Sequence, residues 1–215
     1  MIKHPFDLEK LPDDGIYFFY EEGEVWGHDG HRPRIVRVGA HRSGNFKSRI
    51  NDHFIFNERK MRFNEMQSAP KDRSIFRKNI GRALLNKKES GYLKIWEINF
   101  TDKESRDTKN HLRNIELEKK IESWISGLLR ENFGFRYIAV KNEMGAKGLE
   151  SRLIGTIAQC EYCRPSKKWL GLHSPIDKIG GGKMWLVQHL GSGRITHNDK
   201  SRLQKIINKQ VKIQR

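Results

Sequence analysis

Gly15-Ile16-Tyr17-Phe18-Phe19-Tyr20 and Ile35-Val36-Arg37-Val38-Gly39 are the stretches that decide the fold of this 215-residue chain. Both are rich in aromatic and β-branched residues, which favours β-strands. Residues 21–31 between them are rich in glycine and charge, so they predict a long hairpin connection. The two stretches therefore predict a pair of neighbouring antiparallel strands.

Helical periodicity begins directly after this pair. Phe46, Ile50 and Phe54 share one face of a helix that starts near Phe46, with Ser43 or Asn45 as candidate N-caps. The rest of the chain also divides into regular elements. Helices are expected in 74–85, 113–133, 149–159 and 198–215, the last of them basic, and strands in 92–100 and 136–141.

These elements predict an α+β fold with helical insertions and a basic C-terminal helix. We expect one domain over 1–215, because this length suits a single sizeable core. Its core is expected at about 13–56 and 135–160, with a helical insertion at 57–134 and a C-terminal extension at 161–215.

The charge of the chain predicts its substrate class. Lysine and arginine number 42 against 26 acidic residues, a net charge of +16. Such an excess attracts polyanions and makes their binding salt-dependent, so nucleic acid is the expected partner, although basic proteins without a specific ligand also exist. No apolar run approaches the roughly 20 residues of a bilayer span, and the start carries no apolar signal segment. We expect no membrane association and a cytoplasmic location.

Cys160 and Cys163 are the chain's two cysteines and form a lone C-x-x-C. A structural zinc site needs two more ligands at close spacing, and His173 is the nearest single candidate. A pair of reduced thiols is therefore favoured over zinc at this point.

Glu150 is the most informative acidic residue. In a helix it falls within the arc formed by Leu149, Leu153 and Ile154. An ionised carboxylate in apolar surroundings is costly unless it is paired or binds a metal. A hard oxygen ligand suits Mg²⁺ (or Mn²⁺), and a buried ion pair with an arginine is the alternative.

Three further residues could serve phosphodiester hydrolysis. Arg49 and His53 are four apart, so they share one side of their helix. A guanidinium matches two phosphate oxygens, and an imidazole can relay a proton. Tyr17 points from the sheet opposite to Ile16 and Phe18, and its phenol needs a nearby cation or metal-bound water to act as a base.

The order of these residues resembles the GIY-YIG nuclease superfamily. The resemblance lies in Gly15-Ile16-Tyr17, Arg37-Val38-Gly39, Arg49 with His53, and Glu150 in Leu149-Glu150-Ser151-Arg152-Leu153-Ile154. It implies a small antiparallel sheet flanked by helices that hydrolyses DNA with one divalent ion. By position, Tyr17 matches the first-motif tyrosine, Arg49 the helix arginine and Glu150 the metal-binding glutamate.

The resemblance to this superfamily extends to further residues, and the chain differs from the usual pattern at two positions. His53 matches a histidine of the restriction-enzyme branch, and other stretches resemble uncharacterised bacterial members. Arg37 stands where the second motif usually holds a tyrosine. An asparagine often follows the metal glutamate closely, whereas here the first one after Glu150 is Asn198.

The expected activity is a Mg²⁺-dependent, restriction-like DNA endonuclease. In this mechanism Glu150 binds the metal, Arg49 offsets transition-state charge, and Tyr17 with His53 takes the proton of the attacking water. Arg37, His41, Arg42 and Lys47 are the expected DNA-binding residues. The alternatives are an inactive nucleic-acid-binding protein of the same fold and a DNA repair nuclease. A nuclease that cuts both strands would suit a homodimer.

Overall fold

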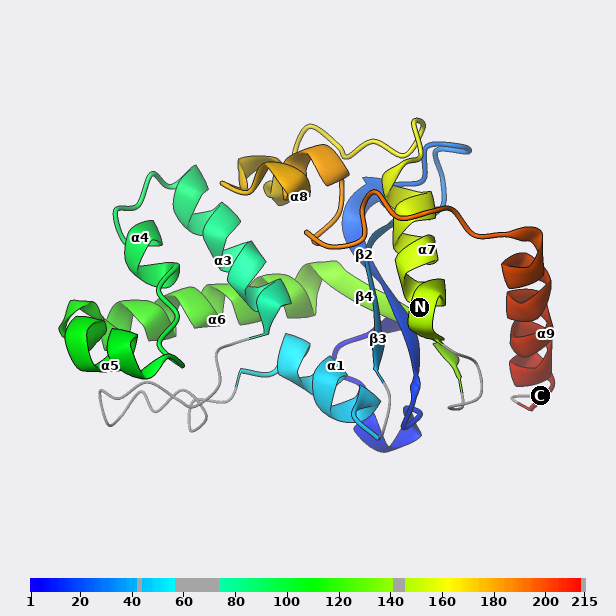
Figure 1. Ribbon diagram of the computed structural model, residues 1–215, viewed down its shortest axis with the longest axis horizontal. Coiled ribbons are helices and arrows are strands. Elements are labelled where there is room, and N and C mark those ends of the chain that lie inside the picture. The colour runs from blue at the N-terminus through cyan, green and yellow to red at the C-terminus, as the bar shows by residue number, and fades with distance from the viewer. Residues whose placement is uncertain (42–43, 57–73, 141–145, 214–215) are drawn as a thin grey trace.

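The computed structural model describes residues 1–41, 44–56, 74–140 and 146–213. Its strands are β1 (Ile2–Lys3), β2 (Gly15–Val25), β3 (Pro33–His41) and β4 (Phe133–Ala139). They form one antiparallel sheet in the order β1-β4-β2-β3, so β2 is central and β3 lies at an edge (Figure 1). The fold is therefore α+β, as predicted, and the strands expected around Gly15, Ile35 and Arg136 are confirmed.

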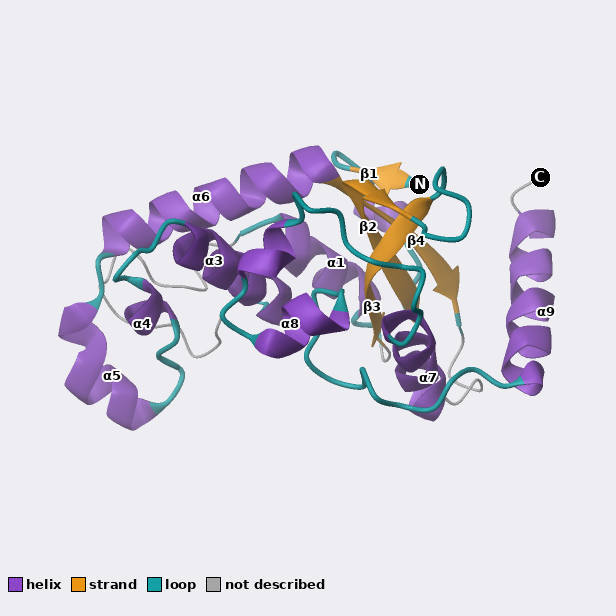
Figure 2. Cartoon of the chain, turned by 90° about the horizontal axis from the view of Figure 1, so that it is seen from above, coloured by secondary structure: helices purple, strands orange, loops and turns teal. Residues whose placement is uncertain are grey.

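Helices surround this sheet. In chain order the helical elements are η1 (Leu8–Lys10), α1 (Phe46–Phe54), α3 (Ile75–Lys87), α4 (Leu93–Trp96), α5 (Lys103–Lys109), η3 (Asn110–Leu112), α6 (Ile115–Asn132), α7 (Ala146–Ala158), η4 (Leu170–His173), α8 (Asp177–Gly182) and α9 (His197–Ile213). Figures 1 and 2 place α4 and α5 at one end of the molecule and α9 at the other.

The alternation of side chains along β2 separates two hydrophobic clusters. Tyr17 and Phe19 belong to the larger one, which includes buried residues of α1, α3 and α6. Ile16 and Phe18 belong to the second, which is built with α7. Because successive strand residues point to opposite faces, α1 and α6 cover one face of the sheet and α7 covers the other.

A buried ion pair connects three helices behind the first face. Arg77 of α3 donates from Nε and Nη2 to Glu122 Oε2 of α6 at 2.9 and 2.8 Å, and both side chains are 1% exposed. Its Nη1 also donates to the carbonyl of His53 in α1 at 3.1 Å. A buried charge needs such a complete set of partners. The pair therefore fixes the C-terminal turn of α1 that carries His53.

The strand expected at 92–100 is wrong. Residues Leu93–Trp96 form the helix α4 instead, and Trp96 is buried against α3. The Trp96 indole donates to Lys78 O at 3.1 Å, and a Cβ at Gly81 would lie only 2.3 Å from its ring. This packing against α3 overrides the β-propensity of the apolar residues.

The hairpin connection is shorter than expected, because β2 continues to Val25 and only 26–32 form the turn. The bounds of the other predicted helices differ from the structure by a few residues, and the candidate cap Ser43 lies outside the described residues. Among the residues that the structure describes, no helix combines the length and apolarity needed to span a membrane.

Candidate active site

Tyr17 lies at the centre of the sheet, opposite Gly39 of β3 and Tyr137 of β4. Its side chain is buried, and its ring passes across the face of Gly39. A Cβ at position 39 would lie 2.2 Å from the Tyr17 Oη, far inside van der Waals contact. The glycine that ends Arg37-Val38-Gly39 is therefore required by the tyrosine of Gly15-Ile16-Tyr17, which connects the two motifs physically.

A chain of hydrogen bonds leads from Tyr17 into α3. The phenol lies 3.0 Å from His53 Nε2, and His53 Nδ1 lies 3.1 Å from Ser74 Oγ. Ser74 is the N-cap of α3 and accepts from the Arg77 N–H. If Tyr17 donates to Nε2, the second imidazole nitrogen donates to Ser74, so the cap serine fixes the orientation of the ring.

Burial and nearby cations set the protonation states of the side chains in and around this hydrogen-bond network. Burial raises the pKa of Tyr17, which the guanidinium of Arg37 opposes. Burial, with Arg37 next, lowers the pKa of His53 well below 6.5. His41, whose ring stacks on Tyr17 at 5.8 Å, has its pKa lowered to about 4 by burial and by Arg49 and Arg37. Near neutral pH the phenol is thus protonated and both imidazoles are neutral.

Glu150 reaches this region from the opposite face of the sheet. It lies in the first turns of α7, and its Oε1 accepts from the backbone N–H of Ala40 at 3.0 Å. Ala40 belongs to the edge strand β3, whose outer amides are available for such bonds. Leu149, Leu153 and Ile154 are buried, whereas Glu150 itself is only half-buried. The carboxylate therefore lies at the sheet edge rather than inside the apolar contact.

A pocket of about 430 Å³ brings these groups together around the edge of β3. Tyr17, Arg37, Gly39, His41, Asn79 and Glu150 line it, together with 186–189. Its walls thus come from β2, β3, α3, α7 and the segment that follows α8. The phenol and the carboxylate, 133 positions apart in the sequence by subtraction of their numbers, face one cavity.

Arg37 is buried in the wall of this pocket. Its Nη1 donates to Trp185 O at 2.7 Å, and its guanidinium carbon lies 4.9 Å from the centre of the Phe76 ring. Its Nε has no hydrogen-bond partner among the described residues. The arginine that replaces the second-motif tyrosine therefore adds a fixed positive charge beside Tyr17.

Arg49 and Lys47, two further predicted site residues, do not line this pocket. Arg49 is exposed on α1, one turn before His53, and its charge lowers the pKa of His41 and His53. It is not among the residues that line the pocket. Lys47 pairs with Glu9 at 3.0 Å and Asp13 at 3.8 Å. Arg42 lies outside the described residues.

Asn79 was not anticipated from the sequence. It is 1% exposed, lines the pocket, and its Oδ1 accepts from Arg82 Nη1 at 2.7 Å. Its Nδ2 has no partner within the described part of the chain. A buried amide thus comes from α3 to the pocket that Glu150 also lines, although the chain lacks an asparagine soon after Glu150. A single asparagine in a helical stretch gives no signal by itself, because its burial depends on the packing of α3.

The donor set fits a hard divalent cation. Mg²⁺ commonly takes one or two carboxylates and keeps several waters for phosphate oxygens to replace. The pocket offers the carboxylate of Glu150 and space for a hydrated ion, with no thiol among the residues that line it. Glu150 is therefore the residue that would hold such an ion.

The comparisons with known proteins agree with this geometry. A family model described as the GIY-YIG domain matches residues 3–213, nearly the whole chain. Searches of curated proteins and of solved structures return no significant match. The match spans both motifs that meet at Tyr17 and Gly39, as well as α1 and α7. The chain belongs to the GIY-YIG nuclease superfamily.

Proposed function

We propose that the protein is a Mg²⁺-dependent DNA endonuclease. The observation that carries this proposal is the meeting of Tyr17, Arg37 and Glu150 in one pocket, with His53 bonded to the phenol. A proton acceptor, a fixed cation and a hard metal ligand are the three groups that phosphodiester hydrolysis needs. The net charge of +16 favours a polyanionic substrate.

The phosphate is proposed to bind between Arg37 and Glu150. The Nε of Arg37 and the Nδ2 of Asn79 are buried donors without partners among the described residues, and both residues line the pocket. Buried donors without partners are costly, so phosphate oxygens that accept from them would be favoured. Arg49, exposed at the outer side of α1, would offset the charge that develops in the transition state.

Tyr17 is proposed to act as a proton relay. With its hydrogen directed to His53 Nε2, the lone pairs of the phenol oxygen face the pocket, where an attacking water can donate. As the water loses its proton to Tyr17 Oη, the phenol passes its own proton to His53. Burial is the main cause of the low pKa of His53, and Arg37 comes next. Because the anionic phosphate is proposed to bind Arg37, the substrate would raise that pKa and favour the transfer.

Glu150 would hold the metal at the floor of the site. When bound, Mg²⁺ supplies Lewis-acid polarisation of the phosphate and stabilises the leaving oxygen. The Ala40 N–H donates to one carboxylate oxygen at 3.0 Å and so restricts the orientation of the carboxylate. A hydrogen bond from the backbone to the ligating carboxylate helps to define the position of a metal ligand.

Surface residues would hold the DNA backbone next to the cleaved bond. His41 lines the pocket mouth, and Arg42 follows it directly in the chain. Lys47 pairs with exposed acids, Glu9 and Asp13, which DNA phosphates can replace as partners. Arg37 is instead assigned to the scissile phosphate, because it is buried.

Supercoiled plasmid is the substrate that tests this proposal. We expect nicked or linear product with Mg²⁺ or Mn²⁺, none after chelation with EDTA, and recovery when Mg²⁺ is restored. Plasmid binding without cleavage in either metal would instead support an inactive DNA-binding protein of this fold. The bond between Tyr17 and His53 favours a restriction-like enzyme, and faster cleavage of branched or damaged duplexes than of intact DNA would favour repair.

A further inference from the structure

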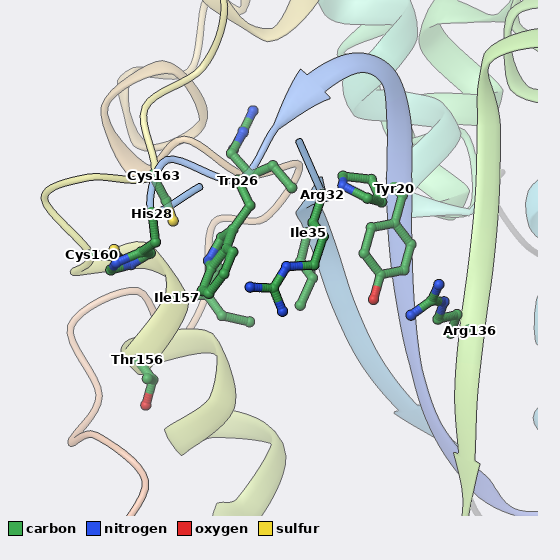
Figure 3. Close-up of a pocket in the computed structure, with 12 residues that line it drawn as sticks. Tyr20, Trp26, His28, Arg32, Ile35, Arg136, Thr156, Ile157, Cys160 and Cys163 are labelled. Atoms are coloured by element: carbon green, nitrogen blue, oxygen red, sulfur yellow. Dashed lines mark hydrogen bonds between the residues drawn. The ribbon is translucent and has the colours of Figure 1, made fainter. Parts of the chain in front are cut away.

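Three soft ligands meet at the other end of the β2–β3 hairpin from Tyr17. His28 Nε2 lies 3.2 Å from Cys160 Sγ, and the ligand atoms of His28, Cys160 and Cys163 all lie within 4.8 Å of one another. Figure 3 shows both sulfurs and the imidazole beyond the Trp26 indole, at one end of a pocket. His28 and Cys160 are 132 residues apart, so the fold rather than the local chain brings them together.

The hairpin turn holds His28 in place. Asp29 accepts from the backbone N–H groups of His31 and Arg32 at 3.0 and 3.1 Å, which closes the turn 26–32. The His28 ring lies between the rings of Trp26 and Tyr162, with centroids 4.7 and 5.1 Å away. Contacts with these two tilted rings therefore restrict the imidazole to one region.

The loop that carries Cys160 and Cys163 packs against the same turn. Cys160 lies two residues beyond the end of α7, and its carbonyl accepts from Lys183 Nζ at 2.9 Å. A Cβ at Gly27 would lie 1.8 Å from Tyr162 O, so only glycine allows the two backbones to approach this closely. Neither cysteine forms a disulfide. Two separate segments thus hold two thiols and one imidazole in a constant arrangement.

We propose that His28, Cys160 and Cys163 bind one Zn²⁺ ion. A tetrahedral zinc with ordinary bond lengths separates two sulfurs by about 3.8 Å and a sulfur and a nitrogen by about 3.6 Å. The observed separations, all within 4.8 Å, require only small side-chain adjustments. Thiolate and imidazole ligands select zinc over Mg²⁺, so this site does not compete for the metal of Glu150.

The fourth position of this zinc is open. The cluster contains three ligands among the described residues, and all three residues line a pocket of about 440 Å³. Three protein ligands with one exchangeable water are a common zinc arrangement. Arg32 and Arg136 line the same pocket, so an anionic group could approach the metal from there.

The metal would join the hairpin tip to the C-terminal end of α7. Glu150 lies near the other end of that helix. Because metal binding to a site that exists only in the folded chain adds folding free energy, zinc should stabilise the contact between hairpin and α7. The assignment is independent of the proposed nuclease activity, because it uses none of the residues around Tyr17.

Metal content and metal-dependent stability test the site directly. We expect native protein, purified with reductant and titrated with Zn²⁺, to hold about one equivalent of zinc. Its Co²⁺ derivative should show the visible absorption of tetrahedral thiolate ligation. Removal of zinc should lower the melting temperature, and Zn²⁺ but not Mg²⁺ should restore it.

Variants separate the proposed ligands from the scaffold. Cys160→Ser, Cys163→Ser and His28→Ala should each bind zinc roughly 100-fold more weakly or worse, whereas His31→Ala, in the same turn, should match the native protein. Gly27→Ala, which keeps all three ligand residues but pushes the turn and the Tyr162 backbone apart, should weaken zinc binding. Native protein that binds no zinc, or variants of the cysteines that bind as tightly as the native chain, would overturn the assignment. None of these measurements uses plasmid cleavage. A failure of the nuclease proposal would therefore not be mistaken for a failure of the zinc assignment.

Discussion

The two ligand clusters lie at opposite ends of the same pair of elements, the β2–β3 hairpin and α7. The cluster around Tyr17 and Glu150 contains a phenol, an imidazole, a carboxylate and buried guanidinium and amide donors. The cluster at His28 consists of two thiols and one imidazole. Because hard and soft donors select different metals, one scaffold can hold Mg²⁺ chemistry at one end and zinc at the other.

Each cluster depends on a glycine that makes room for a close contact. Gly39 is required by the Tyr17 ring, and Gly27 is required by the Tyr162 carbonyl. In both places a glycine allows a close approach, but the first makes room for the phenol that is proposed to react and the second makes room for a backbone contact. Substitutions should therefore affect one end and leave the other unchanged.

The largest effect is expected from Tyr17→Phe. Loss of the hydroxyl removes the proton relay to His53 but keeps the buried ring, so cleavage should fall roughly 100- to 10,000-fold. Zinc content and melting temperature should stay close to native. Tyr20→Phe, which removes a phenol of the same strand that lines the other pocket, is the matched control. Similar cleavage by the native protein and Tyr17→Phe would exclude a relay through this residue.

A smaller effect on cleavage is expected from Gly39→Ala. The added Cβ would meet Tyr17 Oη at 2.2 Å, so the ring or the strand must move. We expect a loss of about 1–3 kcal/mol in the free energy of unfolding and about 100-fold in cleavage. Urea unfolding measures the free energy of unfolding, and single-turnover kinetics measure the cleavage rate. Gly191→Ala, where a Cβ has open space, should change neither.

Asn79→Asp should reduce cleavage by about tenfold. The change keeps an oxygen to accept from Arg82 at 2.7 Å but replaces the buried N–H donor with a negative charge beside the phosphate position. Single-turnover rates at saturating DNA separate a slower cleavage step from weaker DNA binding. Asn86→Asp, on the exposed side of α3, is the control. An unchanged rate in Asn79→Asp would remove Asn79 from the phosphate site.

The smallest effect concerns the pH dependence of stability. The pKa of His41 is about 4 in the folded chain, below its ordinary value of 6.5, so the unfolded chain takes up the proton first as pH falls. Its contribution is therefore fully present above pH 6.5 and lost toward pH 4. His41→Asn should flatten the loss of unfolding free energy in this window, by less than about 1.4 kcal/mol per pH unit because the side chain is partly exposed.

Unfolding curves between these pH values measure that slope. His111→Asn, an exposed histidine of η3, is the control. Equal slopes for the native protein and His41→Asn would contradict the lowering of the His41 pKa by burial, Arg49 and Arg37.

Much of the fold could be predicted from the sequence because its signals are local. Aromatic and β-branched residues mark the strands around Tyr17, and the helix expected from residue 74 begins at its N-cap Ser74. The prediction for 92–100 was wrong because its apolar residues favour a strand, whereas in the structure Trp96 lies in the helix α4 and packs into the space left by Gly81. Such a contact between distant residues leaves no local pattern.

The candidate site was predictable where residues match a motif and unpredictable where packing selects them. The carboxylate and phenol were assigned from their order in the chain, and both line one pocket. Asn79 and His28 were missed because what makes each of them informative lies far away in the sequence: the pocket that Asn79 shares with Tyr17 and Glu150, and the Cys160 thiol beside His28. The roles of Tyr17, Arg49, His53 and Glu150, and the single-domain organisation, stay predictions.

Glu150→Gln is the most direct test of the account. The amide keeps the oxygen that accepts from Ala40 and removes the charge that holds the metal. With cleavage and DNA affinity measured on the same preparations, we predict a loss of roughly 1,000-fold in the Mg²⁺-dependent cleavage rate. DNA affinity and zinc content should match those of the native protein and of Glu161→Gln, an exposed control. A Glu150→Gln protein that cleaves within about tenfold of the native rate at saturating Mg²⁺ would contradict it.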